Sequence, residues 1–228
     1  MSPEPRMVEV RKNVLKQNDV TARALREHFR AKGILAVSLV SSPGSGKTTF
    51  LEKTLTLLRP QYRVAALVGD LATENDAQRL ARSGAPVKQI TTGTLCHLEA
   101  NMIQKALDGW NVDELDFLFV ENVGNLVCPS SYDLGEDLRL VLLSVTEGED
   151  KPLKYPTIFN TADVAVITKM DLAAAVDFNE HALDQNIEAV RPRMRILKLS
   201  AKTGEGMHEF LDCLQKLQRS RPQAASAV

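Results

Sequence analysis

The sequence of 228 residues has few of the features that mark secreted, membrane-spanning or nucleic-acid-binding proteins. It contains only three cysteines, widely spaced and odd in number, which is not the pattern of a disulfide framework. Its beginning holds no apolar run of signal-peptide length, and no later run is long enough to span a bilayer. The net charge of −1 provides no basic surface for nucleic acid or an anionic membrane. We therefore expect a cytoplasmic protein with reduced thiols, no membrane contact and no nucleic-acid partner.

What is present is the composition of an ordinary globular domain, 44% hydrophobic and 25% charged. Short runs rich in Val, Ile and Leu alternate with amphipathic segments, which indicates strands buried on both faces and joined by helices. The expected strands are 34–41, 64–69, 87–91, 115–122, 138–145, 163–169 and 195–201. The expected helices between them are 47–58, 74–83, 97–108, 177–190 and 205–218. This alternation predicts an α/β fold with a mostly parallel central sheet flanked by helices.

Two further segments flank this pattern. Residues 8–32 are charged with scattered apolar positions, and they predict an amphipathic helix that ends at Gly33. The final stretch, "RPQAASAV", has the composition of a disordered tail. We predict a helical arm over 1–33, one domain over 34–218 and a flexible tail over 219–228.

A glycine-rich turn, "SSPGSGKTT", lies between the first expected strand and the next helix. Residues 41–48 fit G-x-x-x-x-G-K-S/T except at the first position, where Ser41 replaces glycine. In such a phosphate loop, backbone N–H groups cradle phosphate oxygens, the lysine reaches the β- and γ-phosphates, and the last hydroxyl binds Mg²⁺. The residues expected to bind a nucleoside triphosphate are Gly44, Ser45, Gly46, Lys47, Thr48 and Thr49.

Two later motifs resemble the guanine-recognition pair of P-loop GTPases, N/T-K-x-D and S-A-K. They read "TKMD" over 168–171 and "SAK" over 200–202. The carboxylate of Asp171 can accept both N–H donors of guanine, which adenine does not offer. We expect Lys169 to lie along the base and Ala201 to donate its backbone N–H. The expected fold is therefore that of a P-loop GTPase, and the expected nucleotides are GTP and GDP.

A GTPase also needs carboxylates near Mg²⁺ and loops that sense the γ-phosphate. Asp70 ends one expected strand, and Glu121 begins "ENVG", which has the spacing of the D-x-x-G switch. We expect Asp70 to position the attacking water or hold Mg²⁺ through water, and Glu121 to be the second carboxylate on the metal side. Asp76 and Glu74 are interpreted as a solvated helix start. No glutamine that orients water is identifiable, so slow hydrolysis is expected.

The predicted catalytic residues are accordingly Lys47, Asp70 and Glu121, and the predicted Mg²⁺ site consists of Thr48, Asp70 and Glu121.

The stretch "TTGTLCHLEANMI" places Cys96 and His97 side by side before an amphipathic run. A helix starting at residue 97 would put His97 on its polar face and Cys96 at its N-terminal end, where the dipole favours thiolate. Cys128 follows just beyond "ENVG", whereas Cys213 has the spacing of a core residue. A free cysteine is usually a small buried hydrophobe, but two thiolates and an imidazole suit Zn²⁺ or Ni²⁺. Water, a carboxylate or a second subunit could supply the fourth ligand.

From about residue 34 to 215 the chain resembles the hydrogenase maturation GTPase HypB, the nickel-incorporation protein. The resemblance is carried by "SSPGSGKTT", "QITTGTLCHLEANM", "FVENVGNLVCPSSYDLGE", "SVTEGEDKPLKYP" and "TKMDL". It implies a GTP-dependent homodimer that works with other hydrogenase maturation proteins to deliver nickel to the large subunit of NiFe-hydrogenase. It further implies that Cys96, His97 and Cys128 bind Ni or Zn at the dimer interface. Lys151 and Lys154 become interaction candidates near the nucleotide, unless they belong to a plain polar loop limited by proline.

Some family members also carry a Cys-rich motif or a His-rich stretch near the N-terminus. Residues 1–33 have no cysteine and only His28, so we do not expect them to store several nickel ions. The nearest alternative is the urease-maturation GTPase, whose metal motif reads Cys-Pro-His rather than Cys-His. A small-molecule P-loop kinase would not need "TKMD" or "SAK". A GTP switch without a metal is the third alternative.

Overall fold

The computed structural model describes residues 6–71 and 75–221. Within these residues it contains a seven-stranded sheet in the order β3-β2-β4-β1-β5-β6-β7, in which every neighbouring pair is parallel. The strands are β1 (Leu35–Ser41), β2 (Val64–Asp70), β3 (Val87–Thr91), β4 (Phe117–Glu121), β5 (Leu138–Ser144), β6 (Val164–Thr168) and β7 (Arg195–Lys198). Each strand lies in one of the predicted apolar runs, so the predicted α/β class with a parallel central sheet is confirmed.

The helices that join these strands follow the predicted pattern with two additions. The α-helices are α1 (Arg6–Ala31), α2 (Lys47–Leu58), α3 (Asn75–Ala81), α4 (Ala100–Leu107), α5 (Lys151–Lys154), α6 (Pro156–Thr161), α7 (Glu180–Val190) and α8 (Met207–Arg219). Short 3-10 turns are η1 (Cys128–Ser131), η2 (Val145–Glu147), η3 (Met170–Leu172) and η4 (Ala174–Val176). The interpretation of "EGEDKPLKYP" as a loop limited by proline is wrong, because Pro152 and Pro156 lie in the first turns of α5 and α6. Proline is tolerated there because the backbone N–H that it lacks has no partner within the helix at these positions.

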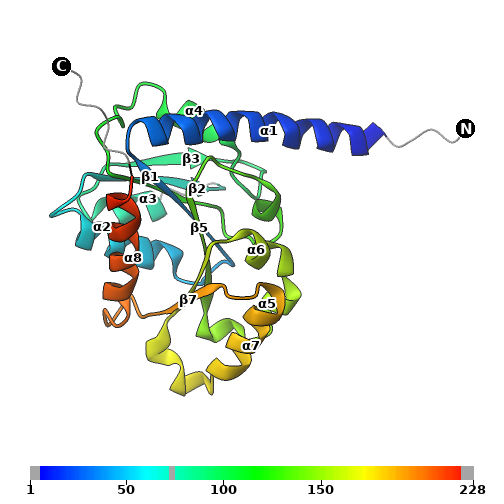
Figure 1. Cartoon of the computed structure of the whole chain (residues 1–228), viewed down its shortest axis with the longest axis vertical. Coiled ribbons are helices and arrows are strands. Elements are labelled where there is room, and N and C mark those ends of the chain that lie inside the picture. The colour runs from blue at the N-terminus through cyan, green and yellow to red at the C-terminus, as the bar shows by residue number, and fades with distance from the viewer. Residues whose placement is uncertain (1–5, 72–74, 222–228) are drawn as a thin grey trace, which may run out of the picture.

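Helices cover both faces of the sheet (Figure 1). On one face α2 and α8 pack against alternate residues of the central strands. On the opposite face α1 and α4 cover the half of the sheet with β2 and β4, and α6 and α7 cover the half with β5 and β6. The central strands are therefore apolar on both sides, which is why their sequences read as continuous rather than alternating runs. In the described part of the chain, no helix combines the length and apolarity required to cross a bilayer.

The amphipathic helix predicted over 8–32 is confirmed as α1, which ends at Ala31. Among its described side chains, from residue 13 onward, the buried apolar residues are Ala22, Leu25 and Phe29. They belong to the same apolar cluster as the buried side of α4, and Figure 1 shows α1 running beside α4 along the top of the sheet. The division into arm, domain and tail stays a prediction, and its outermost residues, 1–5 and 222–228, lie outside the described part.

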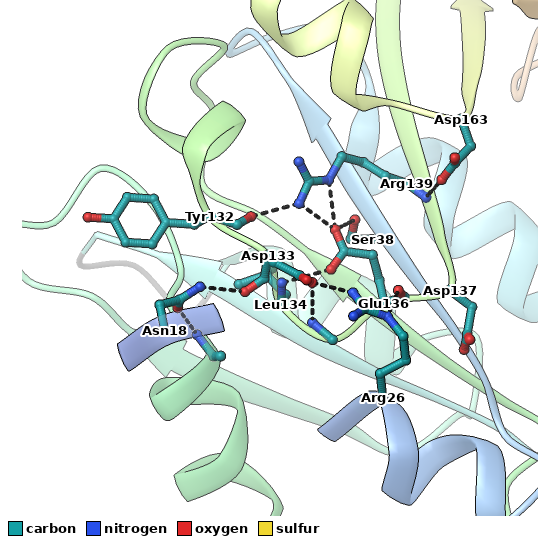
Figure 2. Close-up of polar contacts among 12 residues, drawn as sticks. Asn18, Arg26, Ser38, Tyr132, Asp133, Leu134, Glu136, Asp137, Arg139 and Asp163 are labelled. Atoms are coloured by element: carbon teal, nitrogen blue, oxygen red, sulfur yellow. Dashed lines mark hydrogen bonds and ion pairs between the residues drawn. The ribbon is translucent and has the colours of Figure 1, made fainter. Parts of the chain in front are cut away.

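A buried ion pair joins the segment before β5 to the interior (Figure 2). Arg139 of β5 donates to Glu136 Oε1 at 2.7 Å, and Ser38 Oγ of β1 donates to the same oxygen at 3.0 Å. The strand register places Ser38 opposite Arg139, which explains how one carboxylate reaches both. Arg139 also donates to the Tyr132 carbonyl at 2.7 Å. Glu136 and Arg139 are only 8% and 9% exposed. Each therefore balances the buried charge of the other.

Replacing Arg139 with methionine should leave the Glu136 carboxylate buried without its cation. We expect Arg139→Met to lower the free energy of unfolding by about 3 kcal/mol, measured by urea denaturation. The matched control is Arg63→Met, because the Arg63–Glu114 pair is 61% and 75% exposed and should contribute less than about 1 kcal/mol. Equal losses in the two variants would contradict this account of the buried pair.

Candidate functional site

The phosphate loop follows β1, the strand at which the connections diverge toward opposite edges of the sheet. β1 lies between β4 and β5, and the chain leaves it for β2 on one side before returning to β5 on the other. In parallel α/β sheets, ligands bind beyond the carboxyl ends of strands at such a point. Gly44 and Gly46 take the left-handed φ angles of 76° and 92°, and Gly46 precedes the first residue of α2.

Side chains from two strands, β1 and β6, hold the phosphate loop in place. Ser41, the residue that departs from the glycine of the motif, accepts hydrogen bonds from Ser45 Oγ at 2.5 Å and from Lys47 Nζ at 3.0 Å. From β6, the Thr168 hydroxyl donates to the Ser45 carbonyl at 2.6 Å, and the following Lys169 donates to the Gly44 carbonyl at 2.7 Å. The substitution at position 41 therefore supplies an oxygen that holds the phosphate-loop lysine within the loop.

Thr48 and Glu121 form the oxygen-rich part of the site. The Thr48 hydroxyl donates to Glu121 Oε1 at 2.8 Å, while Glu121 Oε2 is buried with no hydrogen-bond partner among the described residues. Burial raises the pKa of Glu121 to about 7, against the opposing effects of Lys47 and Thr48. Burial likewise lowers the pKa of Lys47, against the attraction of Glu121. These oxygens fit a hard cation such as Mg²⁺, which prefers carboxylate and hydroxyl oxygens.

The two guanine-recognition motifs meet around one cavity of about 210 Å³. Its lining includes Gly46, Thr49, Phe50, Thr168, Lys169, Asp171, Leu172, Ser200, Ala201 and Lys202. Asp171 Oδ1 accepts a hydrogen bond from Ser200 Oγ at 2.6 Å, which joins the end of β6 to the end of β7. The structure thus brings together Lys169, Asp171 and Ala201, although their contacts with a base stay a prediction.

Asp70 lies at the carboxyl end of β2, near the phosphate loop. Its Oδ1 accepts the backbone N–H of Leu71 at 2.6 Å, and its negative charge acts on Lys47. The register pairs Val68 with Glu121, so Asp70 extends two residues further along its strand. Its predicted roles toward water or Mg²⁺ stay predictions.

Two charged residues of α3 also face this region, and the sequence interpretation missed their involvement. Arg79 Nη2 donates to Thr49 Oγ1 at 2.8 Å, and the charges of Asp76 and Arg79 both act on Glu121. Asp76 is in the first turn of α3, as predicted, but it is half-buried rather than simply solvated. The spacing of Asp76 and Arg79 on one helical face was the available signal. Glu74 lies outside the described residues.

Of the two lysines considered near the nucleotide, one reaches the phosphate loop. Lys151 Nζ lies 3.4 Å from Ser42 Oγ and 3.6 Å from Glu147. Lys154 is 60% exposed and pairs with Asp150 at 2.5 Å.

Cys96, His97 and Cys128, the ligand set that the family resemblance implies, lie together, with ligand atoms all within 4.8 Å of one another. The two Sγ atoms are 2.7 Å apart, and His97 Nδ1 is 4.0 Å from Cys96 Sγ. Tetrahedral zinc with 2.3 Å bonds separates two thiolates by about 3.8 Å, so the sulfurs must move apart by about 1 Å to bind one. The donor set fits Zn²⁺ or Ni²⁺, and only small movements are needed.

The environment of His97 suits a neutral ligand. His97 is 7% exposed, and burial lowers its pKa, which favours the uncharged imidazole. Its Nε2 lies 3.5 Å from the Glu99 carboxylate, and its ring lies 4.0 Å from the ring of Tyr132. Nε2 therefore faces Glu99, as in metal sites where a carboxylate orients the ligating imidazole. Beside it, the hydrogen bond with Cys128 raises the pKa of Cys96, an effect that a bound cation would reverse.

The predicted helical start at residue 97 is wrong. α4 begins at Ala100, so Cys96 and His97 lie in the preceding loop and His97 is buried rather than on a polar helical face. The physical reason is that side chains from elsewhere take up the backbone donors. Asn122 Oδ1 accepts from Leu98 N at 3.0 Å, and Asn18 Oδ1 accepts from Ala100 N at 2.9 Å. Cys213 is buried in α8, as predicted.

One short segment connects the two halves of the site. Asn122 directly follows Glu121 and binds the backbone at Leu98, and Asn125 Nδ2 donates to the Cys96 carbonyl at 3.3 Å. Gly124 lies against the phosphate loop, where an added Cβ would come within 3.1 Å of Pro43 Cα. The segment from Glu121 to Cys128 therefore touches both the phosphate loop and the loop that carries Cys96.

This geometry defines the class of protein. It is that of a P-loop nucleotide-binding domain. The phosphate loop lies where the sheet connections diverge, Thr48 and Glu121 offer buried oxygen atoms as metal ligands, and both recognition motifs line one cavity.

Comparison with known proteins identifies the family. The model of the CobW/HypB/UreG nucleotide-binding domain matches residues 35–198. The hydrogenase maturation factor HypB of Rhizobium leguminosarum bv. viciae is 46% identical over 215 residues, which cover 94% of this chain and 72% of that protein. The chain belongs to the HypB family of hydrogenase maturation factors.

Solved structures agree. A crystal structure of HypB from Helicobacter pylori in complex with nickel is 40% identical in sequence to this chain and has a TM-score of 0.85. The match covers 93% of this chain and 100% of that one. The HypB structure from Archaeoglobus fulgidus is 38% identical with a TM-score of 0.82, covering 89% of this chain and 99% of that one.

The raised pKa of Glu121 predicts a specific pH dependence of stability. The pKa of the Glu121 carboxyl is 4.5 in its ordinary state and about 7 in the folded protein. Between these two pH values the folded protein keeps the carboxyl proton that the unfolded chain has lost. The nucleotide-free protein should therefore lose on the order of 3 kcal/mol of stability from this group as the pH rises through that window. Urea denaturation from pH 4.5 to 8 should give a shallower decline for Glu121→Gln, whereas the exposed control Glu114→Gln should follow the parent. Parallel curves for the parent and Glu121→Gln would refute the assignment.

Proposed function

We propose that this chain is a cytoplasmic GTP-binding and GTP-hydrolysing metallochaperone that assists the insertion of nickel into NiFe-hydrogenase. The proposal is carried by the connection between its two sites. Glu121 lies beside the phosphate loop, and the next residue, Asn122, binds the loop that carries Cys96 and His97. The chain's relatives are hydrogenase maturation factors, one of them solved with nickel, which supports nickel as the cargo.

The nucleotide site is proposed to select GTP. Asp171 would accept the two guanine N–H donors, Lys169 would lie along the base, and the Ala201 N–H would donate to it. Lys47 would leave Ser41 for the phosphates, whose negative charge would offset the burial that now lowers its pKa. Backbone N–H groups from Gly44 to Thr49 at the start of α2 would surround the phosphate oxygens.

Hydrolysis would then proceed by in-line attack of water on the γ-phosphorus. A bond forms from the water oxygen to phosphorus, while the bond from phosphorus to the β–γ bridging oxygen breaks, giving GDP and phosphate. Asp70 is proposed to orient that water. Thr48 and Glu121 would hold Mg²⁺, which when bound neutralises charge that develops on the phosphates. Slow turnover is part of this proposal.

The metal site is proposed to lie at the interface of a homodimer that forms with GTP. Cys96 and Cys128 are half-buried, and apolar neighbours, Leu95 and Val127, leave 38% and 61% of their surfaces exposed beside them. Exposed apolar residues around an incomplete ligand set favour a partner surface over open water. A second copy related by a two-fold axis would bring the same residues to the other side.

Nucleotide state is proposed to change metal affinity through the segment from Glu121 to Cys128. A γ-phosphate that moved Gly124 against Pro43 would also shift Asn122 and Asn125, which bind the backbone around Cys96. Such coupling is reciprocal, so the bound metal would alter nucleotide affinity by the same factor. Other hydrogenase maturation proteins and the hydrogenase large subunit would be the partners that exchange nickel.

Asp171→Asn should weaken GTP binding on the order of 100-fold and favour xanthosine triphosphate, because an amide cannot accept both guanine donors. Titration with fluorescent analogues of GTP and xanthosine triphosphate measures the two dissociation constants and therefore the change in nucleotide preference. The control is Asp177→Asn, in an exposed loop where the left-handed backbone tolerates asparagine. Unchanged preference in Asp171→Asn would favour the small-molecule kinase alternative.

Cys96→Ala and Cys128→Ala should each abolish stoichiometric binding of Ni²⁺ or Zn²⁺, because two ligands remain of three. Cys213→Ala is the matched control, since that thiol is buried in α8 away from the cluster. Metal stoichiometry and oligomeric state are measured with GDP and with a non-hydrolysable GTP analogue, and the analogue should increase the dimer and alter metal affinity. Full metal binding by both variants would contradict the assignment of these two thiols as ligands.

A further inference from the structure

Asn18, near the middle of α1, is a buried amide that binds two separate parts of the metal site. It is 6% exposed. Its Nδ2 donates to the Asp133 carbonyl at 2.8 Å, and its Oδ1 accepts from the Ala100 N–H at 2.9 Å (Figure 2). Both polar ends of one side chain are therefore satisfied by backbone groups that lie 115 and 82 residues away in the sequence.

Each of these backbone groups is close to the candidate ligands. Ala100 begins α4, three residues after His97. Asp133 follows Tyr132, whose ring lies 4.0 Å from the ring of His97, and Tyr132 in turn follows η1, which starts at Cys128. The two loops that carry the ligands are thus joined behind the site by Asn18 as well as at the site by the ligands themselves.

The loop before β5 is tightly held to α1 at this point. Arg26 donates to Asp133 Oδ1 at 2.5 Å and to the Glu136 carbonyl at 3.0 Å. Burial alone would raise the pKa of Asp133, but the hydrogen bonds from Arg26 and Gly135 N–H hold it below its ordinary value. Gly135 lies so close to α1 that an added Cβ would come within 2.7 Å of the Ala22 carbonyl. This loop therefore keeps a fixed position relative to α1.

We infer that Asn18 is a positioning residue for the Cys96–His97–Cys128 site, so that the N-terminal helix sets the metal affinity of the domain. This inference rests on the proposed metal function. Ligands on two loops bind a metal tightly only when their backbones are held at the right separation, and residues behind the ligands provide that restraint. Asn18 fixes the separation of the two backbones, while the sulfurs keep the freedom to open from 2.7 Å.

The test compares Asn18→Ala, Asn18→Asp and Gln17→Ala in the full chain. The alanine variant loses both hydrogen bonds. The aspartate variant keeps an acceptor for Ala100 N–H but loses the donor to the Asp133 carbonyl. Gln17 is an exposed amide on the neighbouring position of α1 and serves as the matched control. Ni²⁺ alone is titrated against a competing chelator, and the thiolate-to-nickel charge-transfer band is recorded at saturation.

We expect Asn18→Ala to raise the dissociation constant for Ni²⁺ about 10-fold and to shift the charge-transfer band, with an intermediate effect for Asn18→Asp. Gln17→Ala should match the parent, and nucleotide affinity should stay within about 2-fold in all three, which separates positioning from general loss of structure. Parental nickel affinity and spectrum in a folded Asn18→Ala would overturn the inference. Should the alanine variant fail to fold, parental behaviour of Asn18→Asp overturns it.

Failure of the proposed metal site gives a different result. In that case Cys96→Ala retains parental nickel binding. If only the positioning role is wrong, Cys96→Ala loses binding while Asn18→Ala keeps it.

Discussion

The hydrogen bond from Thr48 to Glu121 constrains the rest of the site, because it ties the first turn of α2 to the carboxyl end of β4 inside a region that water does not reach. β4 lies beside β1 in the sheet, so the phosphate loop and the segment after Glu121 start from adjacent strands. That segment then contacts Pro43 and the loop around Cys96. Direct contacts therefore link the phosphate loop, Glu121 and the loop around Cys96.

Two polar clusters with different purposes flank this central contact. In the ion pair of Glu136 and Arg139 both carboxylate oxygens accept hydrogen bonds, and the pair fixes the segment before β5. Lys47 and Glu121 are buried to a similar degree, but Glu121 Oε2 has no hydrogen-bond partner among the described residues, and both pKa values are displaced toward the uncharged forms. Buried charge that is fully paired supports a rigid scaffold, whereas buried charge that lacks partners marks a place for a charged ligand.

The sheet, the phosphate loop and the recognition motifs were predictable because each depends on local sequence: continuous apolar runs for the strands, and fixed spacing for the loop. The start of α4 was not, since the N–H groups of Leu98 and Ala100 are bound by Asn122 and Asn18 from distant parts of the chain. No helical periodicity contains that information. The same limit hid the burial of His97 and the contact of Arg79 with Thr49, which arise from packing between elements.

The burial of Lys47, which is hydrogen-bonded to Ser41, affects the free energy of unfolding of the whole domain. In the folded state the attraction between Lys47 and Glu121 does not offset the cost of burying them, and a ligand that supplies phosphate and a cation reduces that cost. Occupancy and folding are then linked by mass action: the ligand concentration divided by its dissociation constant sets how far the domain is stabilised. The free energy of unfolding of such a protein depends on the surrounding nucleotide concentration as well as on the packing of its own core.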